Sequence, residues 1–538
     1  MEPLVSNGHE VASVEAQGME AISTVGVVGL GTMGAGIVEV FAKQGLTVTA
    51  VEINDEALDR GRGIIEKSTS RAVERGRLEI DARDALMSRI TWTTDFEALA
   101  QADLVIEAVP ERMEIKRDLF GRLDALCKPS AILATNTSSL SVTQIAATTA
   151  RPDRVVGMHF FNPAPVMKLV EVIRTVLTAP DVIEAVSALA TGSGKTPVVV
   201  GDRAGFVANT LLIGYLNDAV RVFDESSVTR EGIDAAMSVG VGLPMGPLAL
   251  CDLIGLDVCL EVVDVLFSET RDPVHAPAPL LRAMVAAGLL GRKTGRGFYT
   301  YDKPGSGTVV DDAGTPSGTL PGTPALAVVV VGEGGHSDQL AQACEAADLV
   351  VTRLTYDSFD PAHVAADAVV LVDVSPIQRA RDIAVAMEDR RADVVGVHFL
   401  HPGPKGLAVE IALTPFSSPV AVATAALVVQ RAGAEPVVCD DLPGLVAGRL
   451  LTVYLNDAVR MVASGYASPD DVDAAMKLGC GYARGPIEFL EVMNPATICD
   501  ALEAIHSSTR QPRHAPVALL RDSAVYGRNI RELVAQPS

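Results

Sequence analysis

The feature of this sequence that most limits its possible folds is an internal repeat. The segment that begins His159-Phe-Phe-Asn-Pro returns as His398-Phe-Leu-His-Pro, and the shift of 239 positions then continues without a gap. The stretch Tyr215-Leu-Asn-Asp-Ala-Val-Arg221 returns unchanged from Tyr454 to Arg460. Because both copies keep the same pattern of apolar positions, we expect the chain to form the same fold twice.

The two copies differ at polar positions. Asn209 falls on Gly448, and Ser138 falls on Ile377. A repeat that keeps its apolar residues but loses side-chain amides and hydroxyls is typical of a retained fold with lost chemistry. We therefore expect the function to lie in the first copy and the second copy to be architectural.

Length and charge narrow the class of protein. The 538 residues suggest about three to four domains. The formal net charge of −23 argues against nucleic acid or an anionic membrane as a partner, since both repel an acidic surface. No apolar run reaches the roughly 18 residues that a membrane-spanning helix needs.

Two features indicate the compartment. Residues 1–22 contain no Lys or Arg, whereas a secretory or mitochondrial leader needs positive charge, so we interpret them as a flexible tail. The seven cysteines form no Cys-x-x-Cys pair and mostly stand in apolar surroundings. We expect a cytoplasmic protein with reduced cysteines and no metal site.

Strands and helices alternate in the first part of the chain. Short apolar runs are typical of strands at 24–28, 47–51, 104–109, 131–135 and 155–159. The charged stretch from residue 55 to 87 has the periodicity of two amphipathic helices. Such alternation predicts a parallel sheet covered on both faces.

From residue 202 the strand signals vanish. Helical periodicity covers 206–225, 230–239, 249–267 and 279–287, which predicts an all-helical domain over 202–302. Residues 303–324 are rich in Gly, Pro, Ser, Thr and Asp, as linkers are. The sheet pattern then returns over 325–440 and the helical pattern over 441–538.

A glycine-rich turn follows the first expected strand and opens a helix. In Gly29-x-Gly31-x-x-Gly34 the first glycine permits a tight turn, the second lets backbone approach a pyrophosphate, and the third allows close helix–strand packing. Glu52 ends the next strand, where a carboxylate binds ribose hydroxyls and repels a 2′-phosphate. Together these features predict a Rossmann domain over 23–201 that binds NAD rather than NADP.

The second copy carries an altered version of this turn. Gly332-Glu-Gly334-Gly-His-Ser337 has serine in place of the third glycine. Ala347-Asp-Leu-Val350 echoes Ala102-Asp-Leu-Val105, and the short interval before it suggests that the second strand and the helical hairpin are deleted. We expect a degenerate Rossmann-like domain here that binds no dinucleotide.

Four polar positions of the first copy stand among apolar neighbours. His159 ends an apolar strand, where it could take a hydroxyl proton during hydride transfer, and Glu171 could fix its tautomer. Ser138 follows another strand end and could hold the substrate oxygen. Asn209 opens the helical domain and could bond both the substrate and the histidine.

Each position also has a plainer interpretation. A lone histidine in an apolar strand is more often a satisfied core residue, and Glu171 could pair with Lys168. The segment Asn136-Thr-Ser-Ser139 could cap a helix over 142–147. Asn209 could simply begin a helix. Spacing alone leaves these alternatives open.

Longer motifs carry a resemblance. They occur in one order as Asn136-Thr-Ser-Ser-Leu140, His159-Phe-Phe-Asn-Pro163, Met167-Lys-Leu-Val-Glu171, Gly205-Phe-Val-Ala-Asn209 and Gly291-Arg-Lys-Thr-Gly-Arg-Gly-Phe-Tyr299. Over residues 23–302 the chain resembles the L-3-hydroxyacyl-CoA dehydrogenases, which include 3-hydroxybutyryl-CoA and 3-hydroxyadipyl-CoA dehydrogenases. The second half resembles the extra, degenerate unit of longer bacterial members.

The resemblance implies oxidation of an (S)-3-hydroxyacyl-CoA to a 3-oxoacyl-CoA with NAD. It implies that His159 is the general base and Glu171 its partner, and that Ser138 and Asn209 position the substrate. The implied cofactor contacts, beside the glycine turn and Glu52, are Glu111, Lys116, Ser138, Asn162 and Lys293. The implied coenzyme A contacts are Ser68 and Arg75, and the second of these positions is often lysine in the family.

The resemblance also bears on assembly. In members with one helical domain, that domain forms the dimer interface, so the two helical domains of this chain could pack as an intrachain pseudo-dimer. A further homodimer stays open. Two other classes compete: a hydroxy-acid or sugar-acid dehydrogenase of the same fold without CoA, and a non-catalytic scaffold. The intact polar residues of the first copy speak against the scaffold.

Overall fold

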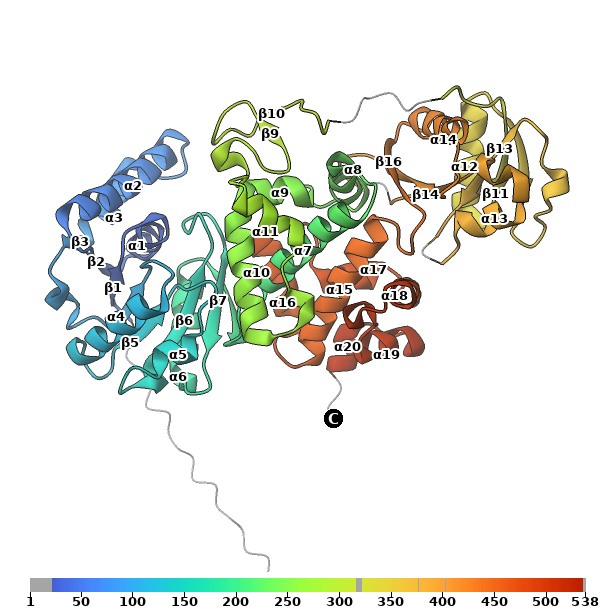
Figure 1. Ribbon diagram of the computed structural model, residues 1–538. Coiled ribbons are helices and arrows are strands. Elements are labelled where there is room, and N and C mark those ends of the chain that lie inside the picture. The colour runs from blue at the N-terminus through green and yellow to red at the C-terminus, as the bar shows by residue number, and fades with distance from the viewer. Residues whose placement is uncertain (1–21, 316–321, 376, 402, 536–538) are drawn as a thin grey trace, which may run out of the picture. The chain divides into compact units, whose positions relative to one another are not determined.

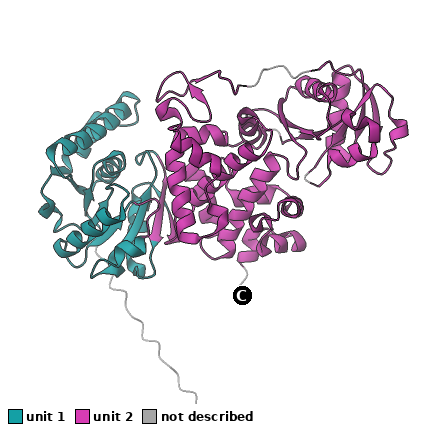
Figure 2. Cartoon of the chain, viewed as in Figure 1, with its two compact units in different colours: residues 1–136, 142–166, 174–197 teal, residues 137–141, 167–173, 198–538 magenta. Residues whose placement is uncertain are grey.

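The computed structural model describes residues 22–315, 322–375, 377–401 and 403–535 (Figure 1). The predicted tail lies outside these residues except for Ile22, as does the 316–321 part of the predicted linker. The chain forms two compact units (Figure 2). Unit 1 contains the described residues up to Asn136, together with Val142–Val166 and Arg174–Pro197. Unit 2 contains Thr137–Ser141, Met167–Ile173 and the described residues from Val198 onward.

Unit 1 is built on a parallel sheet whose strands run in the order β3-β2-β1-β4-β5-β6. These strands are β1 (Thr24–Val28), β2 (Thr47–Val51), β3 (Ile90–Thr93), β4 (Leu104–Glu107), β5 (Ile132–Thr135) and β6 (Val155–Phe160). Every residue of β4, β5 and β6 is buried, as expected of strands covered on both faces. The predicted α/β class with a parallel sheet is confirmed.

Helices connect these strands. They are α1 (Thr32–Gln44), α2 (Asp55–Glu74), α3 (Ile80–Ser88), α4 (Met113–Leu126), α5 (Val142–Ala146) and α6 (Pro180–Gly192). Two further strands, β7 (Leu169–Arg174) and β8 (Thr196–Gly201), precede the helical region. The side chain of Asn54 caps α2 by accepting from the Ala57 N–H at 2.9 Å, which fixes where the hairpin of α2 and α3 begins.

The first helical region lies in unit 2. It comprises α7 (Ala208–Glu225), α8 (Arg230–Ala235), α9 (Pro247–Ile254), α10 (Leu256–Thr270) and α11 (Pro279–Ala286), with a π-helical turn at Ala236–Gly240. The prediction of a single helix over 249–267 is wrong, because the helix is interrupted at Gly255, between α9 and α10. That residue has a φ of 105°, which an L-residue in a helix cannot adopt without strain. A short hairpin, β9 (Thr300–Tyr301) and β10 (Val309–Val310), follows.

A second sheet runs in the order β12-β11-β13-β14-β15-β16. Its strands are β11 (Ala327–Val331), β12 (Val350–Leu354), β13 (Ala368–Asp373), β14 (Val394–Phe399), β15 (Ala408–Leu413) and β16 (Glu435–Asp440). Its helices are α12 (Gly334–Ala346), α13 (Ala380–Ala386) and α14 (Pro419–Arg431). Strands and helices share a core of Val, Leu, Ile and Ala side chains that includes Leu371 and Val428.

The place of β12 corrects one sequence expectation. Strand β11 pairs with β12 on one side and β13 on the other, just as β1 pairs with β2 and β4. Strand β12, which begins at Val350, therefore occupies the position that β2 has in the first copy. The second strand is present, and its deletion was wrongly predicted. The missing elements lie between β12 and β13. A four-residue echo could not reveal this, because backbone pairing and not local sequence decides which side of a sheet a strand joins.

The second helical region repeats the first. It comprises α15 (Ala447–Ala463), α16 (Pro469–Cys480), α17 (Pro486–Val492), α18 (Pro495–Thr509), α19 (Ala518–Tyr526) and α20 (Ile530–Val534). In the described part of the chain no helix is both long and apolar enough to cross a bilayer. None of the seven cysteines, all of which are described, forms a disulfide.

Within unit 2 each helical region contacts the end of the last sheet strand of the other copy, and the two contacts involve equivalent positions. Ser227 donates through its N–H and its hydroxyl to the Asp440 carboxylate, at 3.0 and 2.6 Å. The Tyr466 hydroxyl donates to the Gly201 carbonyl at 3.0 Å. Residue 466 is residue 227 shifted by 239 positions, and residue 440 is residue 201 shifted in the same way. The contact is therefore reciprocal, as in an isologous interface.

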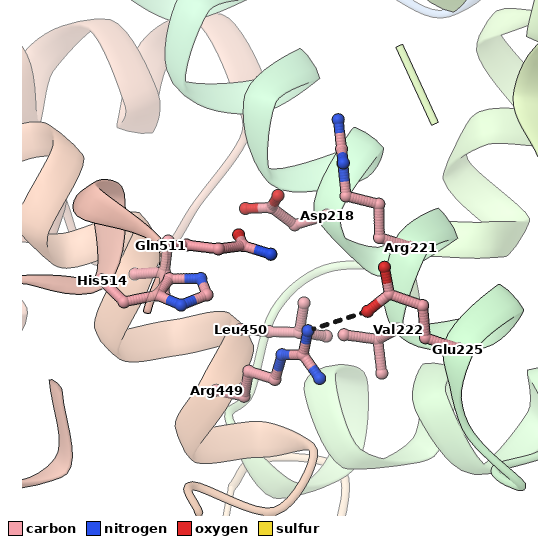
Figure 3. Close-up of a pocket in the computed structure, with 9 residues that line it drawn as sticks. Asp218, Arg221, Val222, Glu225, Arg449, Leu450, Gln511 and His514 are labelled. Carbon is pink, nitrogen blue, oxygen red and sulfur yellow. Dashed lines mark hydrogen bonds and ion pairs between the residues drawn. The ribbon is translucent and has the colours of Figure 1, made fainter. Parts of the chain in front are cut away.

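A buried charge cluster lies at the same interface. The guanidinium of Arg513 pairs with both Asp218 and Asp457, which are equivalent positions of the repeat. Burial raises the pKa of Asp218 to about 6, and Arg513 acts in the opposite direction. Beside this cluster, Arg449 forms an ion pair with Glu225 at 3.2 Å, and both residues line a cavity of about 10 Å³ (Figure 3). That cavity has space for about one water molecule.

Candidate active site

The glycine turn of unit 1 has the geometry that its sequence predicts. Gly29 has a φ of 86°, and its N–H donates to Val51 O at 3.0 Å. A Cβ on Gly34 would lie 1.7 Å from the Gly29 carbonyl oxygen, so only glycine fits. A Cβ on Gly31 would meet no protein atom within 4 Å, which leaves room at the start of α1 for a ligand to approach.

Glu52 lies just beyond β2 and next to this turn. Its Oε1 accepts from the Leu30 N–H at 2.6 Å, and its Oε2 accepts from the Ile53 N–H at 3.0 Å. These two bonds hold the glycine turn next to the end of β2. Sequence reasoning anticipated an acid at this strand end but not its hydrogen bond to the turn.

Lys116 and Glu111 are brought together. The Lys116 ammonium is 1% exposed and lies 3.2 Å from Glu111. It also lies 2.7 Å from Glu107, which ends β4 and which sequence reasoning missed. Glu107 in turn accepts from the Thr135 hydroxyl and from the Val109 N–H. A carboxylate at the end of an otherwise apolar strand was the available signal.

The hairpin of α2 and α3 carries the two expected coenzyme A contacts. Ser68 is half-buried on α2 and forms a hydrogen bond with Glu39. Burial raises the pKa of Glu39, and the bond from Ser68 opposes part of that rise. Arg75 caps the C-terminus of α2 and is exposed. Exposed Lys67, Arg71 and Arg77 surround it in sequence and outnumber the exposed Glu74 and Glu79, so this end of the hairpin has a local excess of positive charge on a strongly acidic protein.

His159 lies in β6 and is only 7% exposed. Its ring packs against Phe161 with centroids 4.5 Å apart. The adjacent Phe160 N–H donates to Asn136 Oδ1 at 2.8 Å, which ties β6 to the end of β5. Asn162 follows on an exposed segment. The imidazole thus stands near the carboxyl end of β6, and ligands bind beyond the carboxyl ends of the strands in such sheets.

Glu171 lies in β7 and is fully buried. Its Oε1 accepts from the Val207 and Ala208 N–H groups at 3.0 Å each, at the start of α7. These two donors fix the side chain of Glu171 at the N-terminus of α7. Asn209 is the second residue of α7, and its side-chain amide makes no hydrogen bond to any described residue. The structure thus brings Glu171 to the helix that bears Asn209.

Ser138 and Lys293 also belong to unit 2. Ser138 is half-buried in the segment after β5, where the Thr137 hydroxyl accepts from the Leu140 N–H at 2.9 Å. Thr137 thereby closes a local turn between β5 and α5. Lys293 forms an ion pair with Asp257 and is 44% exposed.

The second copy shows how the repeat arranges the histidine and the glutamate. His398 lies directly opposite Glu410 in the antiparallel pair of β14 and β15. Glu410 Oε1 accepts from Val446 and Ala447 at 2.9 and 2.8 Å, as Glu171 accepts from Val207 and Ala208. His398, however, turns its Nδ1 to the Val374 carbonyl at 2.9 Å. Glu410 Oε2 is left without a partner among the described residues.

Comparison with known proteins gives the class and then the family. The model of the 3-hydroxyacyl-CoA dehydrogenase NAD binding domain matches residues 24–203 and 355–442. The model of the 3-hydroxyacyl-CoA dehydrogenase C-terminal domain matches residues 205–301 and 444–535. The fold and these matches define an NAD-dependent oxidoreductase. The chain belongs to the 3-hydroxyacyl-CoA dehydrogenase family, and the degenerate tandem repeat is confirmed.

Some similar proteins match nearly the whole chain and others match about half of it. The 3-hydroxyadipyl-CoA dehydrogenase of Escherichia coli (strain K12) is 35% identical over 94% of this chain and 98% of its own. The crystal structure of a 3-hydroxybutyryl-CoA dehydrogenase from Escherichia coli K12 superposes with a TM-score of 0.77 at 33% identity, covering 94% and 98% of the two chains. The 3-hydroxybutyryl-CoA dehydrogenase of Clostridioides difficile is 47% identical over 52% of this chain and 99% of its own.

Proposed function

We propose that this enzyme oxidises (S)-3-hydroxyacyl-CoA to 3-oxoacyl-CoA with His159 as the general base. The substrate class, 3-hydroxybutyryl-CoA or 3-hydroxyadipyl-CoA, is the one named for its relatives. The observation that carries the residue roles is the pairing of His398 with Glu410 in register. Because the 239-position shift has no gap between these residues, His159 and Glu171 occupy the matching positions of the first copy.

The chemistry needs a proton acceptor and a hydride acceptor. NAD⁺ is the hydride acceptor when it is bound. The His159 imidazole takes the hydroxyl proton as the C3–H bond breaks, so that the C3–O bond becomes a carbonyl. Glu171 is held in place by two backbone N–H groups and would stabilise the imidazolium. The unpartnered amide of Asn209 and the Ser138 hydroxyl would hold the substrate oxygen.

We assign the following residues to the cofactor site, most of them in unit 1. Gly31 leaves open space at the N-terminus of α1 for the pyrophosphate, and the Glu52 carboxylate meets the ribose hydroxyls. Buried Lys116 lies between Glu107 and Glu111 beyond β4, and we assign Lys116 and Glu111 to the cofactor site. Asn162 and Lys293 are the remaining proposed contacts.

The basic end of the α2–α3 hairpin favours a CoA substrate over a free hydroxy acid. Exposed Arg75 and its cationic neighbours suit a phosphorylated ligand, although the formal net charge of the whole chain is −23. We expect kcat/KM for the CoA thioester to exceed that for the free acid by more than 100-fold. Arg75→Ala should raise KM for the thioester several-fold and leave kcat unchanged.

We also propose that the two helical regions form an intrachain pseudo-dimer. The reciprocal contacts of Ser227 with Asp440 and of Tyr466 with Gly201 support this assignment, as does the shared Arg513. In the second copy, His401 replaces Asn162 and Ile377 replaces Ser138. That half would then maintain the fold of the first helical region without performing chemistry.

NADH-linked assays test the proposal. The purified full chain is assayed at 340 nm with acetoacetyl-CoA and NADH, and then with 3-hydroxyacyl-CoAs of increasing length, with and without a distal carboxylate. Turnover that rises with the carboxylated substrate would select 3-hydroxyadipyl-CoA. Absence of turnover with every thioester, while a free hydroxy acid is oxidised, would refute the proposed substrate class.

A further inference from the structure

The second sheet has a cavity at its switch point. The glycine-rich turn after β11 leads through α12 to β12 at one edge, while β13 lies on the other side of β11. Ligands bind in open α/β sheets where neighbouring connections diverge in this way. The cavity of about 430 Å³ lies there, lined by the turn residues Glu333 and His336 and by Asp373, Ser375 and Gln378 beyond β13. Its volume is within the range of small-molecule sites.

Asp373 is the unusual member of this lining. It ends β13, is only 9% exposed and borders the cavity. Its backbone carbonyl accepts from the Tyr356 hydroxyl, but its carboxyl has no hydrogen bond or ion pair with any described residue. Burial alone raises its pKa to about 7. A polar group largely withdrawn from bulk water costs free energy unless it is paired, and this carboxyl borders the cavity, where a donor from outside the chain can reach it.

The other residues that line the cavity indicate what kind of ligand could donate to the Asp373 carboxyl. The described residues around the cavity include no Lys or Arg, and Glu333 adds a second carboxylate. His398 lies behind His336, at 6.1 Å between ring centroids, and burial lowers its pKa to about 4, so it supplies no positive charge at neutral pH. Phosphate groups are therefore disfavoured. This agrees with the family match, which resumes only at residue 355, beyond the glycine turn.

Acceptors and donors occur side by side in the cavity. Asp373 and Glu333 offer acceptors, whereas the Gln378 amide and the N–H groups that begin the 13-residue helix α12 offer donors. An ammonium ligand would use only the acceptors. Hydroxyl groups both donate and accept, and two adjacent hydroxyls can meet one carboxylate together.

We propose that the second Rossmann-like domain binds a neutral ligand through a vicinal diol held by the Asp373 carboxyl, as presented by the ribose of a nucleoside or by a free sugar. This is a binding site separate from the proposed catalytic one, and it performs no chemistry. It gives the degenerate half of the chain a ligand of its own after the loss of the dinucleotide turn.

The test is a calorimetric titration of the full chain at saturating NADH, which occupies the cofactor site of the first copy. The probes are adenosine, 2′,3′-dideoxyadenosine, ribose and AMP. We expect about one equivalent of adenosine or of ribose to bind and the dideoxy compound to bind at least tenfold more weakly. Binding of adenosine alone assigns a nucleoside, and binding of ribose assigns a sugar. AMP binding more tightly than adenosine, or no binding of any diol, would overturn the proposal.

Two variants locate the binding. Asp373→Leu removes the acceptor, and Gly335→Phe fills the cavity from a position where a Cβ would meet nothing within 4 Å. Both should weaken binding at least tenfold. Asp357→Asn, at an exposed carboxylate of the same domain, should leave it unchanged. Circular dichroism checks that the variants fold. Binding that survives in folded Gly335→Phe would place the diol elsewhere and exclude this cavity.

Discussion

Tyr215 packs edge to face against Tyr454, with ring centroids 6.0 Å apart, and the two residues are the same position of the internal repeat. A residue that meets its own equivalent lies close to an axis of pseudo-symmetry. The same axis explains why one arginine serves two equivalent aspartates. The covalent tether makes this association intramolecular, so it does not depend on protein concentration.

The general base is tested by His159→Gln. Loss of the proton acceptor should lower kcat by about 10²–10⁴-fold, the usual contribution of a positioned base, while NADH binding measured by fluorescence persists. The matched control is His398→Gln at the equivalent position of the second copy, which should leave kcat unchanged. Near-normal turnover of the first variant would end the assignment.

Cofactor preference is tested at Glu52. Removing the carboxylate in Glu52→Ala should reduce the ratio of kcat/KM for NAD⁺ over NADP⁺ by about tenfold or more, because hydrogen bonds to a charged group contribute about 1.5–3 kcal/mol. Glu52→Gln separates two effects, since it keeps an acceptor for the Leu30 N–H but carries no charge. An unchanged ratio in both variants would count against the ribose role.

The interface charge cluster should be costly to break. Arg513 is 8% exposed, so Arg513→Met leaves Asp218 and Asp457 buried without their partner. Uncompensated buried charge typically costs about 3–5 kcal/mol, seen as a lower midpoint in urea unfolding at pH 7.5. Exposed Arg528→Met is the control. Adding Asp218→Asn and Asp457→Asn to the Arg513 variant should restore much of the loss; equal midpoints for all variants would contradict the cluster's role.

Glu410 predicts a pH dependence. Burial raises its pKa to about 7, and the N–H groups of Ala447 and Val446 oppose that shift only in part. Between the unfolded pKa of about 4.3 and pH 7 the folded state binds more protons, so this group's contribution to stability decreases as pH rises. Glu410→Gln keeps the acceptor and should stabilise the protein by on the order of 2 kcal/mol at pH 8. Little change is expected near pH 4.5, and an equal effect at both pH values would be inconsistent with titration of Glu410.

Much of the fold could be predicted because its signals are local. The glycine spacing requires a tight turn, and the observed φ of Gly29 and the contact of Gly34 with the Gly29 carbonyl are what that spacing demands. Apolar runs without alternation indicated strands buried on both faces. His159 and Ser138 were singled out in the sequence because each stands at or just beyond the end of an apolar strand, and their roles stay a prediction.

Other features depended on distant partners. The break at Gly255 divides a stretch whose periodicity is continuous, and β12 joined the side of the sheet that its short motif did not indicate. Lys116 was expected to contact the cofactor, yet its closest contact is Glu107, nine residues earlier and on a strand. No local pattern encodes such a pairing.

The sequence by itself determined that one architecture occurs twice and that only the first copy retains its polar residues, because a gap-free repeat records both directly. Only the tertiary structure decided where Glu171 is anchored, how the helical regions meet and that Asp373 borders a cavity without a partner. The physical reason is that turns and strands follow from neighbouring residues, whereas the partner of a buried charge follows from which distant segments pack against it.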